Sequence, residues 1–218
     1  MTANAAPTVV KLGGSLAEGE TQRLSTILGI VSAATRPCVV VPGGGAFADT
    51  VRDAYRSHGL TQAVAHRMAL LAMHQTGMML AASDSRFVCV ETLSAIRRAL
   101  RESRVPVWMP LKLSADDAHI THDWKTTSDG LAARLAERLG GTPVVLVKSC
   151  PVDPQATAAA LSRAGIVDAA FPRIVARAKL AWRVLGAGDE GELADLLGVE
   201  VGVARPSAPR RRAIRRGK

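Results

Sequence analysis

The chain has 218 residues, of which 48% are hydrophobic and 22% are charged. This length and this apolar fraction suit one compact domain with a real core, and they exclude a chain that is disordered throughout. Aromatic residues make up only 3%, which argues against nucleic-acid-binding surfaces built from stacked rings, such as an RRM.

The formal net charge of +9 is concentrated at the C-terminus. Residues 205–218 contain seven Lys and Arg side chains and no acidic residue, which leaves +2 for the rest of the chain. We therefore predict one domain over residues 1–204 and a basic, disordered tail over residues 205–218, because the tail has too few apolar residues to fold alone. Electrostatic binding of nucleic acid by the tail is the alternative interpretation, but no nucleic-acid partner is expected.

The sequence predicts a cytoplasmic protein that does not enter a membrane. Residues 1–8 lack the charged start and apolar run of a secretory signal, and polar residues interrupt the most apolar stretch, Ala63–Ala82. The cysteines Cys38, Cys89 and Cys150 lie far apart without CxxC spacing, which is typical of reduced thiols.

Short apolar runs, which predict strands, alternate with segments of helical periodicity. In chain order we expect strand Thr8–Leu12, helix Thr21–Ala34, strand Pro37–Val41, helices Ala46–Ser57 and Thr61–Ala82, strand Arg86–Glu91, helix Leu93–Ser103, strand Val105–Met109, helix Asp129–Leu139, strand Val144–Lys148, helices Ala156–Ala164 and Arg173–Leu180, strand Ala181–Leu185 and helix Glu190–Leu197. Apolar strands in this alternation predict an α/β fold with a mainly parallel sheet covered on both faces.

Two glycine clusters directly follow the first two predicted strands. They read K-L-G-G-S at residues 11–15 and P-G-G-G-A at residues 42–46. Glycines at these positions let backbone N–H groups face an anion, and ligands of open α/β sheets bind at the carboxyl edge. Tight turns are the other interpretation of each cluster taken alone. Neither cluster is a P-loop or a dinucleotide-binding G-x-G-x-x-G motif.

Two further positions carry charge near the same predicted edge. The segment W-K-T-T-S-D-G at residues 124–130 enters a helix. Ser128 there is expected as the N-cap, and Asp129 either complements the helix dipole or positions lysines. Lys148 ends a buried strand, where it is either a surface residue with a buried stem or a phosphate contact.

Together these motifs resemble the amino acid kinase family, over about residues 8–200. The matching segments, in the family's order, are V-V-K-L-G-G-S-L, V-V-V-P-G-G-G-A-F-A-D, T-S-D-G-L-A-A-R-L-A and V-V-L-V-K-S. The resemblance implies a three-layer αβα sandwich around a mainly parallel sheet, activity as a kinase that uses ATP and Mg²⁺, and a homo-oligomer.

Within the family, three further stretches resemble the kinases that act on 5-(aminomethyl)-3-furanmethanol phosphate in methanofuran synthesis. They are A-H-R-M-A, H-D-W-K-T-T-S-D and V-D-A-A-F-P. This resemblance implies transfer of a phosphoryl group to a small phosphomonoester, with UMP or isopentenyl phosphate as alternative acceptors.

The resemblance also implies roles for individual residues. Lys11, Asp129 and Lys148 are the expected catalytic residues, with Asp129 holding the lysines. Expected contacts of the ATP phosphates are Gly13, Gly14, Ser15 and Lys179, of which Lys179 is only the nearest counterpart of a lysine that the family places after a glycine. Expected contacts of the acceptor are Gly43, Gly44, Gly45, Arg52, His66 and Arg67. The last three are the candidates for binding an anionic acceptor, and each is otherwise interpreted as a solvated helix residue.

The chemistry of the acceptor follows from the side chains at the glycine edge. Phosphoryl transfer needs positioning and charge stabilisation more than covalent catalysis. A phosphate acceptor with a second pKa of about 6 is already ionised at neutral pH and needs no general base. The sequence places no evident base at this edge, which favours a phosphate or a carboxylate acceptor over an alcohol.

The chain departs from the family pattern in the half expected to bind ATP. Residues 149–153 read S-C-P-V-D and lead almost directly into an alanine-rich segment, where the family has a hairpin. An alternative hypothesis is therefore a family member that binds a nucleotide or oxyanion with little or no catalysis. A polar loop with His119, His122, Asp116, Asp117 and Asp123 lacks metal-ligand spacing, and no protein-bound metal site is expected.

Overall fold

The computed structural model describes residues 6–17, 21–115, 117–121 and 123–200. Within these residues six parallel strands form one sheet with the order β3-β4-β2-β1-β5-β6. The strands are β1 (Thr8–Leu12), β2 (Cys38–Pro42), β3 (Phe87–Val90), β4 (Val105–Trp108), β5 (Val144–Val147) and β6 (Trp182–Leu185). The predicted parallel α/β fold is confirmed, and the predicted tail of residues 205–218 lies outside the described residues.

Helices lie between the strands along the chain. They are α1 (Thr21–Ala33), α2 (Gly45–His58), α3 (Gln62–Ala81), α4 (Leu93–Arg101), α5 (Leu111–Ser114), α6 (Ser128–Arg138), α7 (Ala158–Arg163), α8 (Phe171–Arg177) and α9 (Glu190–Leu197), together with the 3-10 helix η1 (Gly14–Ala17). Thr61, the first residue of the predicted long helix, is the N-cap of α3, because its side chain accepts a hydrogen bond from the N–H of Val64. The two shortest segments, η1 and α5, were not predicted from periodicity.

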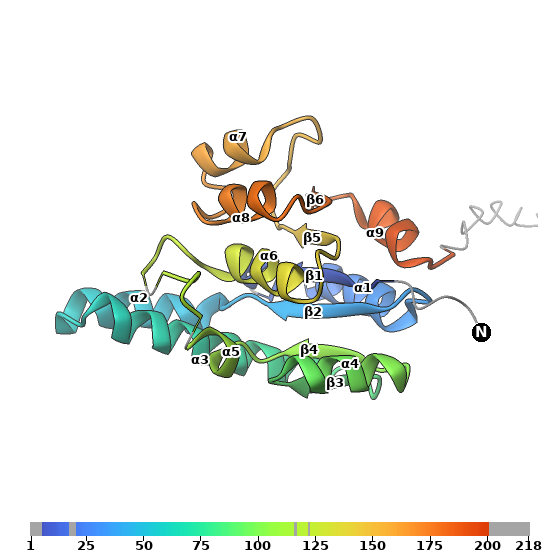
Figure 1. Ribbon diagram of the computed structural model, residues 1–218, viewed down its shortest axis with the longest axis horizontal. Coiled ribbons are helices and arrows are strands. Elements are labelled where there is room, and N and C mark those ends of the chain that lie inside the picture. The colour runs from blue at the N-terminus through green and yellow to red at the C-terminus, as the bar shows by residue number, and fades with distance from the viewer. Residues whose placement is uncertain (1–5, 18–20, 116, 122, 201–218) are drawn as a thin grey trace, which may run out of the picture.

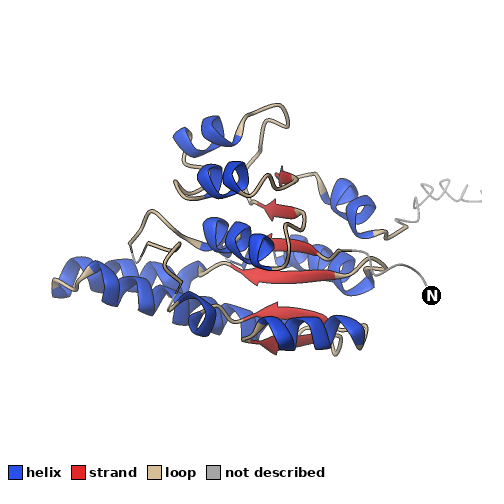
Figure 2. Cartoon of the chain, in the orientation of Figure 1, coloured by secondary structure: helices blue, strands red, loops and turns tan. Residues whose placement is uncertain are grey.

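Each strand contributes side chains to two hydrophobic cores, because neighbouring residues point to opposite faces of the sheet. Val9 and Leu146 belong to the core beneath α4, α6 and α8, whereas Val10 and Val147 belong to the core beneath α1 and α9. Figures 1 and 2 show these helices in layers on the sheet. This double burial explains why the strands are continuous apolar runs rather than polar alternations.

The helix pair α2–α3 extends beyond the carboxyl ends of the strands (Figure 1). The two helices pack through a small core of their own that includes Ala48, Val51, Ala65 and Ala72. Gly59 ends α2 in the left-handed conformation with φ of 60° and allows the sharp turn into α3. The pair therefore forms one wall beside the carboxyl edge of the sheet.

The predicted helix starts differ from the observed ones by one or two residues at α2, α3, α6, α7 and α8. Helix α6 starts at Ser128 with Thr127 as its N-cap residue, so Ser128 is not the cap. Helix α8 starts at Phe171 rather than at Arg173, because Pro172 is accommodated in its first turn. In both helices the first N–H groups bond to the carboxylate of Asp168, a residue distant in sequence from Ser128.

Candidate active site

The strand register brings the two glycine clusters to the same level of the sheet. Leu12 pairs with Pro42 on one side and with Val147 on the other. The clusters touch so closely that a Cβ on Gly14 would lie 2.2 Å from the backbone nitrogen of Gly45. Only glycine allows this approach, and the loops after β1 and β2 therefore form one continuous surface.

Lys11 and Lys148 lie on the same face of the sheet as a consequence of strand periodicity. Lys11 comes two residues after Val9, and Lys148 comes two residues after Leu146. Both of these apolar residues belong to the core beneath α6. Because α6 packs across β1 and β5, its first turn brings Asp129 close to both lysines.

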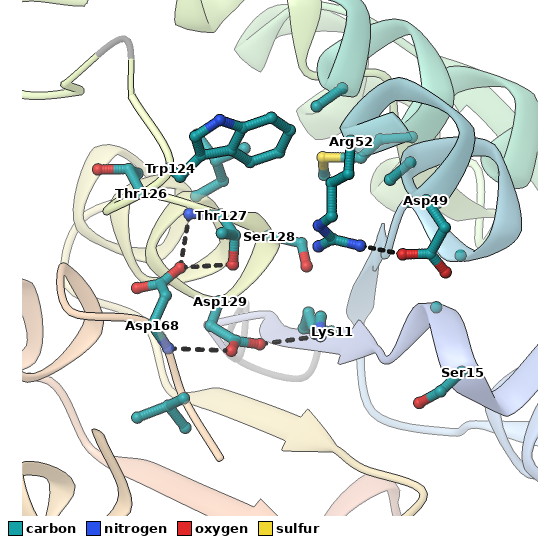
Figure 3. Close-up of a pocket in the computed structure, with 18 of the residues that line it drawn as sticks. Lys11, Ser15, Asp49, Arg52, Trp124, Thr126, Thr127, Ser128, Asp129 and Asp168 are labelled. Atoms are coloured by element: carbon teal, nitrogen blue, oxygen red, sulfur yellow. Dashed lines mark hydrogen bonds and ion pairs between the residues drawn. The ribbon is translucent and has the colours of Figure 1, made fainter. Parts of the chain in front are cut away.

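The Asp129 carboxylate binds both lysines, as Figure 3 shows in part. Its Oδ1 lies 2.8 Å from Lys11 Nζ, and its Oδ2 lies 2.7 Å from Lys148 Nζ. The side chains of Lys11 and Asp129 are each 5% exposed, and that of Lys148 is 12% exposed. Within this cluster two cations share one anion, and the Asp168 carboxylate is a second negative charge that acts on Lys148.

These contacts shift the pKa values of the cluster. Burial alone would raise the pKa of Asp129, but the charges and hydrogen bonds of Lys11 and Lys148 outweigh it and hold the pKa below its ordinary value. Burial, together with the positive charge of Lys11, lowers the pKa of Lys148 to about 8, and Asp129 offsets this only in part. The pKa of Lys148 therefore lies well below that of an exposed lysine.

The cluster lies in a cavity of about 550 Å³, a size typical of small-ligand sites. The cavity is lined by both glycine loops, by the start of α2, by α3, by residues 124–129 and by residues 165–168. Arg52 of α2 pairs with Asp49 and lies 5.7 Å from the ring centroid of Trp124. Figure 3 shows Asp168 beside Asp129 and Arg52 above Lys11.

The structure brings most of the predicted site residues to this cavity. Those that line it are Lys11, Gly14, Ser15, Gly44, Gly45, Arg52, His66, Asp129 and Lys148. His66 is buried, with 7% of its surface exposed, so the interpretation as a solvated helix residue is wrong. The hydroxyl of Ser15 lies 2.7 Å from that of Ser149, which places the first glycine loop next to the end of β5.

Four predicted site residues are placed elsewhere. The N–H of Gly13 donates to Val147 O, and the N–H of Gly43 donates to Leu12 O. Both groups extend the sheet and are not available to a phosphate. Arg67 is exposed and does not line the cavity. Lys179 precedes β6, so it lies at the amino edge of the parallel sheet, opposite the cavity. Lys179 therefore does not line the cavity with the other predicted phosphate contacts.

Three residues that the sequence analysis gave no role belong to the site or support it. Trp124 and Asp168 line the cavity. Arg23 of α1 donates to the carbonyls of Lys148 and Gly186, and thereby ties the ends of β5 and β6 together. Trp124 and Asp168 both occur in stretches with family resemblance, but no spacing rule gives either a function.

The polar loop after α5 is organised by hydrogen bonds and ion pairs. Asp117 binds Arg134 and Arg138 of α6, and the Asp123 carboxylate accepts from Thr121 and from the N–H of Lys125. His122 and Asp116, which were weighed as metal ligands, lie outside the described residues. Among the residues that the structure describes, no group of three His, Cys, Asp or Glu side chains is placed to hold a metal.

No helix of the described chain is long and apolar enough to span a bilayer.

Comparisons with known proteins support the architecture. The model of the amino acid kinase family matches residues 6–151. A [5-(aminomethyl)furan-3-yl]methyl phosphate kinase from Methanocaldococcus jannaschii is 25% identical over 138 residues, which is 63% of this chain and 63% of that kinase. The match therefore spans less than two thirds of the relative.

Two solved structures share the fold. A uridylate kinase from Archaeoglobus fulgidus superposes with a TM-score of 0.63 at 18% identity, covering 88% of this chain and 96% of that one. The UMP kinase from Ureaplasma parvum has a TM-score of 0.62 at 12% identity, covering 88% and 94%. At these identities the likeness establishes the architecture, and it confirms the three-layer αβα sandwich.

Proposed function

The chain belongs to the amino acid kinase family, and from this premise we propose that it is an ATP-dependent kinase that phosphorylates a small phosphomonoester to a diphosphate. The observation that carries this proposal is the buried Lys11–Asp129–Lys148 cluster, which lies beside two apposed glycine loops. Such a cluster stabilises the negative charge that develops as a phosphoryl group moves between two oxygens.

In this proposal each residue of the cluster has a separate role. Lys11 binds the phosphoryl group in transfer, and Lys148 binds the nucleotide phosphates on the side of residues 165–168. Asp129 sets the distance between the two ammonium groups by binding one with each oxygen. Gly14, Gly44 and Gly45 allow phosphates to approach the backbone closely, because no side chain occupies that surface.

The carboxylates in the cavity favour an acceptor that needs no general base. Asp129 is bound to both lysines, Asp49 is paired with Arg52, and Asp168 accepts hydrogen bonds from several N–H groups. A phosphate is already ionised at neutral pH, and we propose that Arg52, which lines the cavity, binds it. We propose that the acceptor is 5-(aminomethyl)-3-furanmethanol phosphate, on which the named relative acts. UMP and isopentenyl phosphate are the alternative acceptors.

The donor set is consistent with Mg²⁺ carried by the nucleotide. Magnesium in kinases is bound largely by substrate phosphates and water, with one or two carboxylates. The carboxylates that line the cavity are few and already bonded, so the phosphates of ATP would hold most of the coordination sphere. Bound there, the ion would neutralise charge on the β- and γ-phosphates.

We also propose a homo-oligomer in the cytoplasm. Helix α3 exposes Val64, Leu71, Met78 and Met79 by 44–55% of their surface, although its opposite face is already buried. A helix that is apolar on both faces favours a second packing partner. Free thiols at all three cysteines are typical of a reducing compartment.

The test is release of ADP from Mg-ATP by the full chain with each of the three acceptors. We expect turnover that is greatest with the furan phosphate and is lost in both Lys11→Ala and Asp129→Asn. Lys112→Ala is the matched control, because Lys112 is exposed on α5, outside the cavity. A folded protein that binds ATP without turnover on any acceptor would overturn the kinase proposal and support the non-catalytic alternative.

A further inference from the structure

Asp168 joins two helices at the edge of the candidate active site. One carboxylate oxygen, Oδ2, accepts from the N–H of Thr127 at 2.7 Å, from the Thr127 hydroxyl at 2.9 Å and from the N–H of Gly130 at 2.8 Å. The other oxygen, Oδ1, accepts from the N–H groups of Ala170 and Phe171 at 3.1 and 2.9 Å. Asp168 therefore bonds the first turns of both α6 and α8.

Burial and the negative charge of Asp129 raise the pKa of Asp168, and the hydrogen bonds from Gly130 and Thr127 oppose this shift. All five partners donate, which favours the anionic carboxylate. If Asp168 were protonated, its O–H would point at an N–H or O–H donor, whichever of the two oxygens carried the proton. In the ion pairs of the described residues Asp168 has no cationic partner. The positive ends of two helices compensate its charge instead.

Asp168 is also connected to the lysine cluster. Its own N–H donates to Asp129 Oδ2 at 3.3 Å, the oxygen that also binds Lys148. Thr127 and Gly130, which Asp168 holds, lie on either side of Asp129 along the chain. The backbone of Asp129 is thus fixed from both sides, and its carboxylate is fixed by a hydrogen bond.

We propose that Asp168 is a positioning residue of the phosphoryl-transfer site, which holds Asp129 in the one orientation that lets its two oxygens bind Lys11 and Lys148. This inference rests on the proposed kinase function. It concerns a residue outside the region that the family model matches, which ends at residue 151. Segment 165–168 is therefore part of the active site, although it is far from the glycine motifs in sequence.

A second consequence concerns the charge state of Lys148. The charged groups that face Lys148 are Lys11 on β1, Asp129 on α6 and Asp168 before α8. Burial and Lys11 lower the pKa of Lys148, and the two carboxylates raise it. Loss of the Asp168 charge should therefore move the titration of Lys148 to lower pH, an effect that a merely structural role would not produce.

The experiment compares wild type with Asp168→Asn by two measurements. The first is the pH profile of kcat/KM for phosphoryl transfer. We expect a loss of about 100-fold at neutral pH, the size of effect that misplaced reacting groups produce, and an alkaline limb shifted to lower pH. The second is NMR titration of lysine side chains labelled with ¹⁵N at Nζ, with Lys148 assigned by Lys148→Arg. We expect its midpoint to fall in Asp168→Asn.

Asp117→Asn is the matched control. Asp117 is also a buried carboxylate that accepts several hydrogen bonds, but its partners are Arg134, Arg138 and the N–H of His119. It does not line the cavity. This variant should lose thermal stability while its kcat/KM and the Lys148 titration stay at wild-type values.

Two results would overturn the proposal. The first is a folded Asp168→Asn variant whose kcat/KM equals that of wild type. A variant whose kcat/KM is reduced equally at every pH, with an unchanged Lys148 titration, contradicts the proposal in the same way. If Asp168→Asn does not fold, Asp168→Glu takes its place, because it keeps the charge but displaces the oxygens. A folded Asp168→Glu with wild-type kcat/KM would be the second contradicting result. If wild type shows no turnover, the kinase proposal fails separately, and the lysine titration still tests Asp168.

Discussion

At the scale of residues, the site depends on the sharing of one buried carboxylate by two lysines. A buried ion pair contributes little net stability by itself, but removal of one partner leaves an uncompensated charge and costs about 3–5 kcal/mol. In this cluster the cations exceed the anion by one charge, since Lys11 and Lys148 both bind Asp129. In the proposed function, a phosphate would bind between these side chains.

The first prediction concerns the pH dependence of activity. Lys148 has a pKa of about 8, so it loses its proton as the pH rises through that value. Because the protonated form binds phosphate, kcat/KM of wild type should fall about tenfold per pH unit above about pH 8. Lys148→Arg, whose guanidinium stays charged, should show no such limb, although its maximum rate will be lower. Initial rates between pH 6 and 10 provide the measurement. An identical alkaline limb in both proteins would exclude Lys148 as its source.

The sequence predicts some site residues and misses others for a physical reason. The positions of Lys11, near the end of β1, and Lys148, directly after β5, were predicted from strand direction, and their roles were expected from the family resemblance. Lys179 was misplaced because it was assigned by likeness to a motif, whereas it precedes its strand. Asp168 was missed because its partners are N–H groups distant in sequence, which leave no spacing pattern.

At the scale of elements, the backbone contact between the two glycine loops sets the shape of the cavity. A Cβ at residue 14 would meet the nitrogen and Cα of Gly45 at 2.2 and 2.5 Å. These are backbone atoms at the start of α2, and they cannot move aside without displacing the helix. The loop after β1 and the wall formed by α2 are thus positioned by each other.

The second prediction follows from this contact. Gly14→Ala should separate the two loops, lower the melting temperature and reduce kcat/KM by about 100-fold, because the bound phosphates are no longer aligned. The matched control is Gly29→Ala. Gly29 is exposed in α1, and a Cβ there meets nothing within 4 Å, so this variant should gain about 1 kcal/mol of stability. Thermal unfolding and steady-state rates test both. Wild-type activity in Gly14→Ala would contradict the assigned role of the contact.

The third prediction concerns the exposed face of α3. Val64, Leu71 and Met78 recur every seven residues along it, which gives a continuous apolar stripe suited to a facing helix. Leu71→Glu combined with Met78→Glu should convert the oligomer into a monomer, measured by light scattering during size-exclusion chromatography. Ala176→Glu on α8 adds a negative charge at another exposed helix position and should leave the mass unchanged. A monomeric wild type would exclude the interface.

Helix limits show where periodicity is informative and where it is not. Helix α9 matches its predicted limits, Glu190–Leu197, because its apolar face is regular and Gly198 ends it in the left-handed conformation. Helix α8 stops at Arg177 because the backbone of Lys179 has φ of 51°, which interrupts the helix before the predicted end at Leu180. Tertiary contacts fix such ends, and a pattern of apolar residues does not report them.

At the scale of the whole molecule, the sheet explains how distant motifs come together. The chain builds β1 and β2 at the centre, adds β3 and β4 on one side, and then returns to place β5 and β6 on the other. The glycine loops therefore meet Lys148 although more than 100 residues separate them in sequence. This topology was predicted only as far as a parallel sheet, because strand order depends on long-range pairing that local sequence does not encode.

The last prediction concerns the division of the chain into domain and tail. Among the described residues, those that form the cavity and both sheet cores lie before residue 200, and residues 205–218 carry seven positive charges without an acid. Removal of residues 205–218 should therefore leave the melting temperature and kcat/KM at full-length values. It should lower the salt concentration at which the protein elutes from heparin, because fewer counterions are released on binding a polyanion. Replacement of the same basic residues by Gln in the full-length chain separates charge from length and should give the same elution. A loss of melting temperature or activity on truncation would show that the tail belongs to the folded domain.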